Sequence, residues 1–497
     1  MVFFLALTLG AGAGETNKPI RVRPEVAWSQ PGRASVTTPT LQVVVNPPLL
    51  RGSPIHDAAF RALHDLAPDY ARFVPWRPYP RLAVAELEPP SASSTSWDFA
   101  LIDPLVDDFL AATKGHPSVI NFSTTPQWMW VTPKRVAYPA DPAEVAWNYE
   151  GGTELRDPSG RELADYYGRV AAWYTAGGFV DEVGRHHSSG RHDRIDYWEV
   201  LNEIEPEHAI DIRKYTRLYD QIVKAVRTVT PRTRFVGMAL GRPRIAPESF
   251  AYFLDPRNHE PGIPLDAISY HFYATPTVDQ PPEVQQFTVW DQAEGFVNVI
   301  RYIEQIRKRL SPQTKVMINE VGAITADDIR QREPGHVMQP IPASYWNLIG
   351  GMFAYLYGEC AGMGIDVIAA SQLVGYPTQY PSVSLVDWNT GEPNARFWVL
   401  KLLRDHLSPE DRVVAVSHTG NLVYAQGFLA PTGERKLLVV NKRNTAVEIE
   451  VRGAKGGTLH VVDQGTGSHA PRSSGISGAS FELEGYGVAI LQLPALP

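Results

Sequence analysis

Two carboxylic residues stand at the ends of apolar runs that are typical of buried strands. Glu203 follows the run 195–201 in "RIDYWEVLNEIEPEH", and Glu320 ends the run "KVMINE". Each comes directly after an asparagine, Asn202 or Asn319. Two carboxyl groups that face one cavity can cleave a glycosidic bond, because one protonates the leaving oxygen while the other attacks the anomeric carbon or activates water. The pattern therefore indicates acid–base chemistry on a carbohydrate, provided that the fold brings both groups to one place.

The runs that carry these residues belong to a repeated pattern. After about residue 40, short apolar runs alternate eight times with amphipathic stretches, such as 211–229 with Tyr215, Tyr219 and Ile222 on one helical face. The predicted strands are 41–47, 70–76, 118–126, 195–201, 234–241, 265–274, 315–323 and 365–375. The predicted helices are 55–66, 102–115, 162–179, 211–229, one near 247–254, one with Phe296, Ile300, Ile303 and Leu310 on one stripe, one near 343–361, and 394–407.

Eight strand–helix units predict an α/β fold, a (β/α)8 TIM barrel spanning 39–408. Near-continuous apolar strands are typical of parallel sheets that are buried on both faces. A doubly wound open sheet is the alternative, but the first strand leads into "VVVNPPLL" rather than a glycine-rich phosphate loop. Reactive residues of such barrels lie at the C-terminal ends of the strands, which is where Glu203 and Glu320 fall, on strands four and seven.

The two ends of the chain differ from the barrel pattern. Residues 409–497 contain short alternating runs separated by Gly, Asn, Asp and Pro, which predict a C-terminal antiparallel β-sandwich that a strand from 19–38 could join. Residues 1–14 resemble a signal peptide with an apolar run and "AGA", so we expect a secreted or periplasmic protein. A disordered tail or a wrongly assigned start is the alternative. The run is too short to span a membrane, and no membrane insertion is expected.

Composition limits the partners and cofactors. The 497 residues carry a net charge of -8 without a basic cluster, which argues against nucleic acid as the main partner. Cys360 is the only cysteine, so no internal disulfide can form, and no spacing suggests zinc. His186, His187 and His192 precede the fourth strand, away from the expected site, and are interpreted as an ordinary loop. We expect no metal and no cofactor, since the carboxyl groups supply both acid and nucleophile; the sequence does not indicate the oligomeric state.

The motifs also resemble a known group of enzymes. "WEVLNE" and "MINE", in an eight-unit barrel with a trailing sandwich, resemble the retaining glycoside hydrolases of clan A, most closely family 39 with its β-xylosidases and α-L-iduronidases. "WDFALIDPLVDDFL", "FSTTPQWM" and "ISYHFYA" add to the resemblance. It implies that Glu203 is the acid/base and Glu320 the nucleophile. It also implies that Asn202 binds the sugar 2-hydroxyl and that His271 and Tyr273 line the site.

Aromatic and basic residues near strands two and three are further candidates for substrate contact. Trp76 and Trp128 follow these strands, and sugar faces stack on aromatic rings; loop packing is the alternative, and Trp128 is the stronger candidate because it lies in "TTPQWM". Three arginines near the second strand could contact a uronate carboxylate, although a structural role is more common: Arg72, Arg77 and Arg81.

Other acidic residues near Glu203 are interpreted as structural or peripheral. Glu199 points to the same side of its strand but lies about 13 Å below, four residues at about 3.3 Å each, which is too far for it to act with Glu320. We expect Glu199 to be a buried carboxylate paired with Arg72. Three residues of the following loop are expected at the rim: Glu205, Glu207 and His208.

These inferences predict a retaining glycoside hydrolase that acts on poly- or oligosaccharides, β-xylosidase-like or another β-glycosidase. A carbohydrate-binding barrel without catalysis and a transglycosidase with the same residues remain alternatives. The sequence leaves the sugar and the choice between exo and endo cleavage open.

Overall fold

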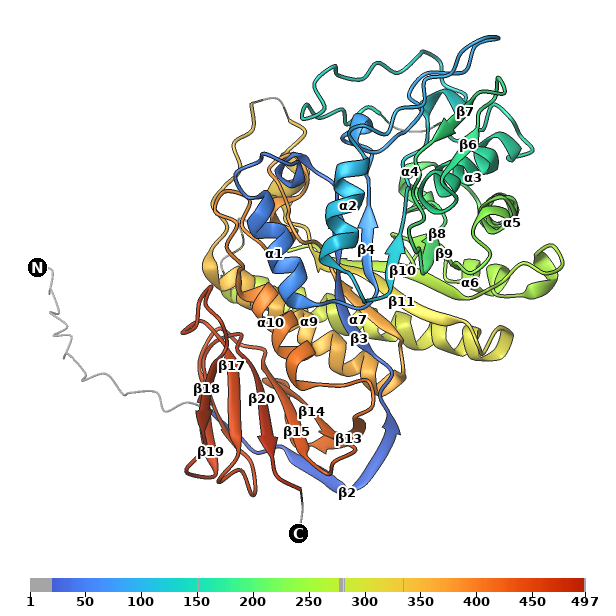
Figure 1. Ribbon diagram of the computed structural model, residues 1–497. Coiled ribbons are helices and arrows are strands. Elements are labelled where there is room, and N and C mark those ends of the chain that lie inside the picture. Colours follow the sequence, from blue (N-terminus) through green and yellow to red (C-terminus); the bar gives the residue numbers. More distant parts are fainter. Residues whose placement is uncertain (1–19, 150–151, 277–279, 281, 334, 496–497) are drawn as a thin grey trace, which may run out of the picture.

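The chain folds into a closed parallel barrel followed by an antiparallel sheet domain, which confirms the predicted fold class (Figure 1). The computed structural model describes residues 20–149, 152–276, 280, 282–333 and 335–495. Residues 1–14, where a signal peptide is predicted, lie outside the described residues. The last barrel strand pairs with the first through Val367 and Thr38, which closes the ring. In order around the barrel, the strands are β3 (Thr38–Val44), β4 (Ala71–Val74), β5 (Ser118–Ile120), β8 (Tyr197–Glu199), β9 (Arg234–Leu240), β10 (Ala267–Ala274), β11 (Lys315–Ala323) and β12 (Val367–Ala370).

Amphipathic helices cover the barrel where the helical spacing predicts them. In α5 (Ile212–Val229), Tyr215, Tyr219 and Ile222 are fully buried on one face. Asp211 fixes the start of α5, because its side chain accepts hydrogen bonds from two backbone N–H groups of the first turn. The other helices that follow barrel strands are α1 (His56–Leu66), α2 (Asp103–Ala112), α3 (Arg161–Thr175), α6 (Glu248–Phe253), α7 (Pro282–Leu310), α9 (Ala343–Met363) and α10 (Ala395–His406).

Short elements occupy the loops between these units. The histidine-rich segment forms β7 (His186–Ser188), which pairs with β6 (Gly178–Val180) in a hairpin rather than an irregular loop. There His187 Nε2 lies 2.9 Å from Asp181 Oδ2. Two short helices follow strands that carry candidate site residues: α4 (Ile204–Glu207) and α8 (Ala326–Arg330). Within the described part of the chain, no helix is both long enough and apolar enough to cross a bilayer.

The C-terminal domain consists of two sheets that recruit strands from the start of the described chain. β2 (Glu25–Ala34) pairs with β13 at the edge of a seven-stranded sheet, and β1 (Ile20–Val22) pairs with β16 in a three-stranded sheet. The polar segment before the barrel therefore contributes one strand to each sheet. The remaining strands are β13 (Arg412–Ser417), β14 (Val423–Leu429), β15 (Arg435–Asn441), β16 (Val447–Glu450), β17 (Thr458–Val462), β18 (Arg472–Gly475), β19 (Ser480–Leu483) and β20 (Val488–Leu493).

The large C-terminal sheet packs against α9 and α10, as Figure 1 shows. Helix α9 is apolar on all sides because the barrel lies on one side of it and the sheet on the other. Cys360, the lone cysteine, is fully buried in this helix. The sheet thus closes the outer surface of the barrel beside α9 and α10 and forms one folded body with it.

Candidate active site

The two carboxylic residues meet at the C-terminal end of the barrel. Glu320 lies in β11, the seventh barrel strand, and Glu203 follows β8, the fourth. The backbone of Glu203 has φ 38°, in the left-handed region, so the chain turns sharply between β8 and α4. The N–H group of Glu203 donates to the carbonyl of Ala239, which ties this turn to β9. The turn directs the Glu203 side chain into the barrel mouth.

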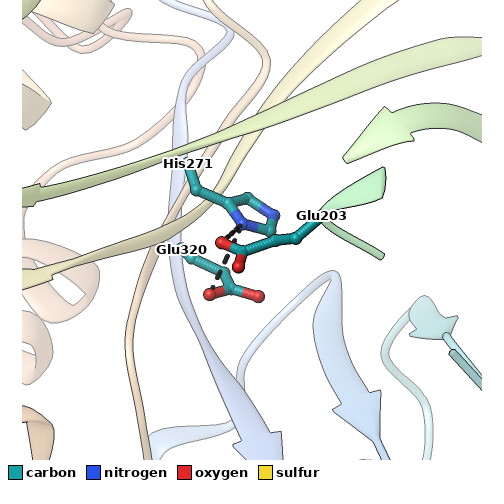
Figure 2. A group of neighbouring side chains, drawn as sticks. All are labelled: Glu203, His271 and Glu320. Carbon is teal, nitrogen blue, oxygen red and sulfur yellow. Dashed lines mark hydrogen bonds and ion pairs between the residues drawn. The ribbon is translucent and has the colours of Figure 1, made fainter. Parts of the chain in front are cut away.

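Glu203, His271 and Glu320 form one cluster, shown in Figure 2. One oxygen of each carboxylate and one ring nitrogen of His271 all lie within 4.8 Å of one another. His271 Nδ1 lies 2.8 Å from Glu203 Oε1 and 3.5 Å from Glu320 Oε2. His271 is opposite Glu320 in the register of β10 and β11, which explains why the two side chains meet. The imidazole therefore bridges the two carboxyl groups.

Glu320 is held as a carboxylate. Its Oε1 accepts a hydrogen bond of 2.5 Å from Arg72 Nη1, and its Oε2 accepts one of 2.6 Å from the Tyr273 hydroxyl. Burial alone would raise the pKa of Glu320, but the positive charges of His271 and Arg72 and these two hydrogen bonds lower it below its ordinary value. Glu320 is therefore ionised at neutral pH, as a nucleophile must be.

The pKa of His271 is shifted in the opposite direction, above its ordinary value. Its burial would lower the pKa of the imidazole, but the charge of Glu320 and the hydrogen bond to Glu203 outweigh burial and raise it. A proton on Nδ1 is then shared with Glu203 at 2.8 Å. The cluster therefore keeps Glu320 ionised and holds a proton next to Glu203.

Below the cluster, Arg72 is fully buried and joins Glu320 to Glu199. Arg72 Nε donates to Glu199 Oε2 at 2.5 Å, which confirms the predicted pairing. Arg72 Nη1 also donates to Gln42 Oε1, and Nη2 donates to Asn202 Oδ1, each at 2.7 Å. Glu199 is thus a structural carboxylate, and Arg72 cannot lie at the rim to meet a substrate.

Asn202 and Trp76 converge on Glu207, one of the residues expected at the rim. Asn202 Nδ2 and Trp76 Nε1 both donate to Glu207 Oε1 at 2.9 Å. Glu207 is buried, and this burial raises its pKa to about 7, although the charge of Arg77 opposes the shift. Both polar ends of Asn202 are therefore engaged by protein groups, with Arg72 and with Glu207.

A cavity of about 600 Å³ opens above the cluster. It combines polar groups for sugar hydroxyls with aromatic surface, a mixture typical of small-molecule sites. Of the predicted substrate contacts, it receives Asn202, Tyr273 and Trp76 together with both carboxylates. Its further lining residues are Gln42, Val44, Val74, Arg77, Pro206, Gly241, Arg242, Thr275, Ile324, Ile329, Arg332, Gln372, Tyr380 and Val383.

Two predicted contacts do not line this cavity: His271 lines an adjoining one, and Trp128 lies elsewhere. The Trp128 ring lies in another cavity, of about 300 Å³, where Arg156 covers it at 4.6 Å. Its Nε1 donates to the Glu86 carbonyl at 3.0 Å, which fixes the ring as part of the loop packing. Arg81 is likewise structural, since its Nε donates to the carbonyl of Pro139. The sequence made Trp128 the stronger candidate for substrate contact, but Trp76 is the one that lines the cavity.

The cluster is also the group of described residues whose spacing could hold a metal ion. Both oxygens of Glu320 already accept hydrogen bonds, from Arg72 and Tyr273. A second cation beside the buried Arg72 guanidinium would be repelled in a medium of low dielectric. The residues therefore fit proton transfer and nucleophilic attack better than metal binding.

Several groups of the site escape sequence reasoning. Gln42 lies within an apolar run of the first strand and contacts Arg72, which a lone polar residue in such a run could have indicated. Gly241 leaves space for the Glu203 side chain, because a Cβ atom there would lie 2.6 Å from Glu203 Oε1. Tyr380 follows β12 and lines the cavity from a loop, where no spacing predicts its direction.

Comparison with solved structures shows that the whole architecture recurs in carbohydrate-active enzymes. The GH51 arabinofuranosidase from Xanthomonas axonopodis pv. citri is similar over 96% of this chain and 100% of its own, with TM-score 0.62 and 12% identity. A glucosidase from Croceicoccus marinus, with the same coverage, has TM-score 0.60 and 12% identity. A monomeric β-xylosidase from Caulobacter crescentus CB15 has TM-score 0.57 and 15% identity over 96% of this chain and 99% of its own. At these identities the similarity is one of fold.

Sequence comparison adds one match, in the C-terminal domain. Residues 423–491 match the model of the D-apionate lactonase C-terminal immunoglobulin-like domain. The match extends from β14 into β20 and does not include the barrel. No curated protein sequence matches the chain.

Proposed function

We propose that this protein is a retaining glycoside hydrolase with Glu203 as acid/base and Glu320 as nucleophile. The supporting observation is the distance of at most 4.8 Å between oxygens of the two carboxylates, at the mouth of one barrel. Retaining enzymes hold their carboxyl groups about 5–5.5 Å apart, whereas inverting enzymes need about 6.5–9.5 Å to admit a water molecule. Membership of glycoside hydrolase family 39 is part of the proposal and rests on "WEVLNE" and "MINE".

The reaction proceeds by double displacement. The Glu320 carboxylate attacks the anomeric carbon while the proton held by Glu203 and His271 passes to the leaving oxygen, so the glycosidic bond breaks and a glycosyl–enzyme ester forms. Glu203 then removes a proton from water, which attacks the same carbon and releases Glu320. Arg72 and Tyr273 keep Glu320 ionised before the attack through their hydrogen bonds.

The substrate is proposed to be a poly- or oligosaccharide with β-linked sugars, of the β-xyloside type or a related β-glycoside. The three similar structures are described as an arabinofuranosidase, a glucosidase and a β-xylosidase, so chromogenic glycosides of these sugars are the first substrates to assay. Trp76 contributes to the aromatic surface of the cavity, together with Tyr273 and Tyr380, and a sugar ring can stack on this surface.

Anion rescue tests the assigned roles. Glu320→Ala should abolish hydrolysis, and azide should restore part of it and yield a glycosyl azide of inverted configuration, because the small anion takes the place of the carboxylate. Glu203→Ala should retain activity only on glycosides with good leaving groups, which need no protonation. The exposed Glu410→Ala is the control and should behave as wild type.

The alternatives give different outcomes in the same assays. Binding of glycosides without hydrolysis by the wild type would identify a carbohydrate-binding barrel. Transfer of the sugar to an added acceptor, with little hydrolysis, would identify a transglycosidase with the same residues. Equal loss in both variants without azide rescue would contradict the two roles.

Hydrolysis of a sugar lactone is a second candidate function. The observation that favours it is the match of residues 423–491 to the C-terminal domain of D-apionate lactonase. A carboxylate beside an imidazole can also activate water for attack on a lactone carbonyl. Acid release from a panel of aldonolactones, followed at constant pH, would distinguish this activity from the cleavage of glycosides.

A further inference from the structure

A second cavity adjoins the carboxylate cavity on the side of β9 and β10. It encloses about 340 Å³ and shares four lining residues with the first: Gly241, Arg242, Tyr273 and Thr275. Its own lining residues come from the loop after β9, from β10 and from α7: Pro243, Arg244, Ile245, His271, Phe272, Gln292 and Phe296. The two cavities are therefore continuous, and a substrate that fills the first can extend into the second.

The second cavity is positively charged. Arg242 and Arg244 are exposed at its edge, and none of its lining residues is acidic. Among the residues that the structure describes, neither guanidinium group has a hydrogen-bond or ion-pair partner. The chain as a whole carries a net charge of -8, so this local excess of positive charge is not a general property of the surface.

His271 adds a buried polar atom without a partner. The residue is 1% exposed, and its Nδ1 is engaged with Glu203. Its Nε2 has no hydrogen-bond partner among the described residues, and the ring lines the second cavity. A buried polar group without a partner is costly, so the site is completed when a polar ligand atom reaches this nitrogen.

The same cavity offers an apolar wall. Phe272 and Phe296 stack with ring centroids 4.5 Å apart and an interplanar angle of 11°. Ile245, at the rim, is 73% exposed. A ligand with a ring and an anionic substituent can thus place the ring against the apolar wall and the charge between the arginines.

We propose that this second cavity is the leaving-group subsite and that it binds a leaving group that carries a carboxylate. The inference rests on the proposed glycoside hydrolase function. Gly241 lines both cavities and lies against Glu203, since a Cβ atom there would be 2.6 Å from Glu203 Oε1, so the leaving group that Glu203 protonates departs where the second cavity begins. Two guanidinium groups at the edge can bind a carboxylate with charge-assisted, bidentate hydrogen bonds.

Paired substrates test the charge preference. We compare two aryl glycosides of the sugar that the chromogenic panel identifies. The 4-(carboxymethyl)phenyl glycoside carries a negative charge, and the 4-(carbamoylmethyl)phenyl glycoside is neutral. In both, a CH2 group separates the substituent from the ring, so the phenols are similar as leaving groups. The wild type should have a kcat/KM about tenfold higher for the carboxylate, the effect of one charge-assisted hydrogen bond. The ratio should fall at high salt, because exposed charges are screened.

Arginine variants locate the effect. Arg244→Gln should reduce the ratio several-fold, and the double variant R242Q/R244Q should bring it near one. Arg232→Gln, at an exposed position before β9, is the matched control and should keep the wild-type ratio. Thermal unfolding shows whether each variant folds. If the double variant does not fold, the ratio measured for R244Q alone tests the subsite.

The outcomes separate the subsite from the function. A wild type that cleaves both glycosides with equal kcat/KM, or a ratio that the arginine variants leave unchanged, overturns the subsite and leaves the glycoside hydrolase function intact. Absence of hydrolysis of every glycoside overturns the proposed function and this inference with it.

Discussion

At the scale of single residues, the site gives two similar side chains different partners. Glu320 accepts hydrogen bonds from Arg72 and Tyr273 and is almost fully buried. Glu203 is hydrogen-bonded to His271, and the Glu203 side chain is 22% exposed. A carboxylate with a cation and a phenol at its two oxygens stays ionised, whereas its neighbour remains next to a transferable proton.

The contribution of Tyr273 can be measured directly. Its hydroxyl lowers the pKa of Glu320, so Tyr273→Phe should raise that pKa. At mildly acidic pH more of Glu320, the proposed nucleophile, is then protonated, and the acid limb of the pH profile of kcat/KM should move to higher pH. Tyr302→Phe, at a residue that is 54% exposed, is the control. An acid limb that stays in place or moves to lower pH would contradict the role of the hydroxyl.

Glu207 links the site to the pH dependence of stability. Its pKa of about 7 in the folded protein lies above the ordinary value, so the folded state binds this proton more tightly than the unfolded state. The resulting stability is fully present below about pH 4.5 and is lost as the pH rises through about 7, by up to about 3 kcal/mol. Glu207→Gln cannot ionise. Urea unfolding at pH 5 and pH 8 should therefore show a smaller difference for the variant; an equal difference would argue against the shift.

At the scale of elements, strand pairing and one turn place Glu203, His271 and Glu320. The registers of β8, β9, β10 and β11 bring His271 opposite Glu320 and hold the turn at Glu203 against Ala239. The register of β10 with β11 shifts between Ser269 and His271. Such irregularities at the rims of barrels re-aim side chains, and here the shift precedes the residue that bridges the carboxylates.

Gly241, at the end of β9, sets the space for the acid. Gly241→Ala would place a Cβ atom 2.6 Å from Glu203 Oε1, so the carboxyl group must move, although the backbone can accept alanine. We expect a loss of about 10–100-fold in kcat/KM for substrates with poor leaving groups and less for good ones, because displacing the carboxyl group removes part of the about 100–10,000-fold that general acid catalysis contributes. Gly295→Ala, with no atom near the added Cβ, is the control. Equal losses for both kinds of substrate would contradict the role of the space at Gly241.

At the scale of the whole molecule, the C-terminal sheet is part of the barrel's core. Alternate residues of β15 face different neighbours: Leu438 and Val440 belong to the core that fills the barrel and its helices, while Leu437 and Val439 belong to the core between the two C-terminal sheets. This double burial explains why the four central residues, "LLVV", are all apolar although the strand lies in an antiparallel sheet.

A shared core should make the two parts unfold together. Leu438→Ala, at a fully buried position, should lower the free energy of unfolding by about 2–5 kcal/mol, and calorimetry should show a single transition at lower temperature. Val337→Ala, at a residue that is 75% exposed, should leave the transition in place. Two separate transitions, with only one of them shifted, would show that the sheet and the barrel are independent.

The sequence by itself determined the architecture and the positions of the two carboxylates. Periods of two and 3.6 residues are local properties, so eight strand–helix units and Glu203 and Glu320 at strand ends follow from the chain alone. The pairing of Glu199 with Arg72 also followed, because alternation along a strand fixes which side a residue faces.

Only the tertiary structure decided which side chains surround those carboxylates. Arg72 also contacts Glu320, and His271 lies between Glu203 and Glu320. Gly241 leaves space for the Glu203 side chain. Trp128 turned away from the cavity, whereas Trp76 entered it. These arrangements depend on register across strands that are distant in sequence and on the paths of loops. Neither the register nor the path of a loop produces a periodic pattern in the sequence, so the packing of the folded chain determines both.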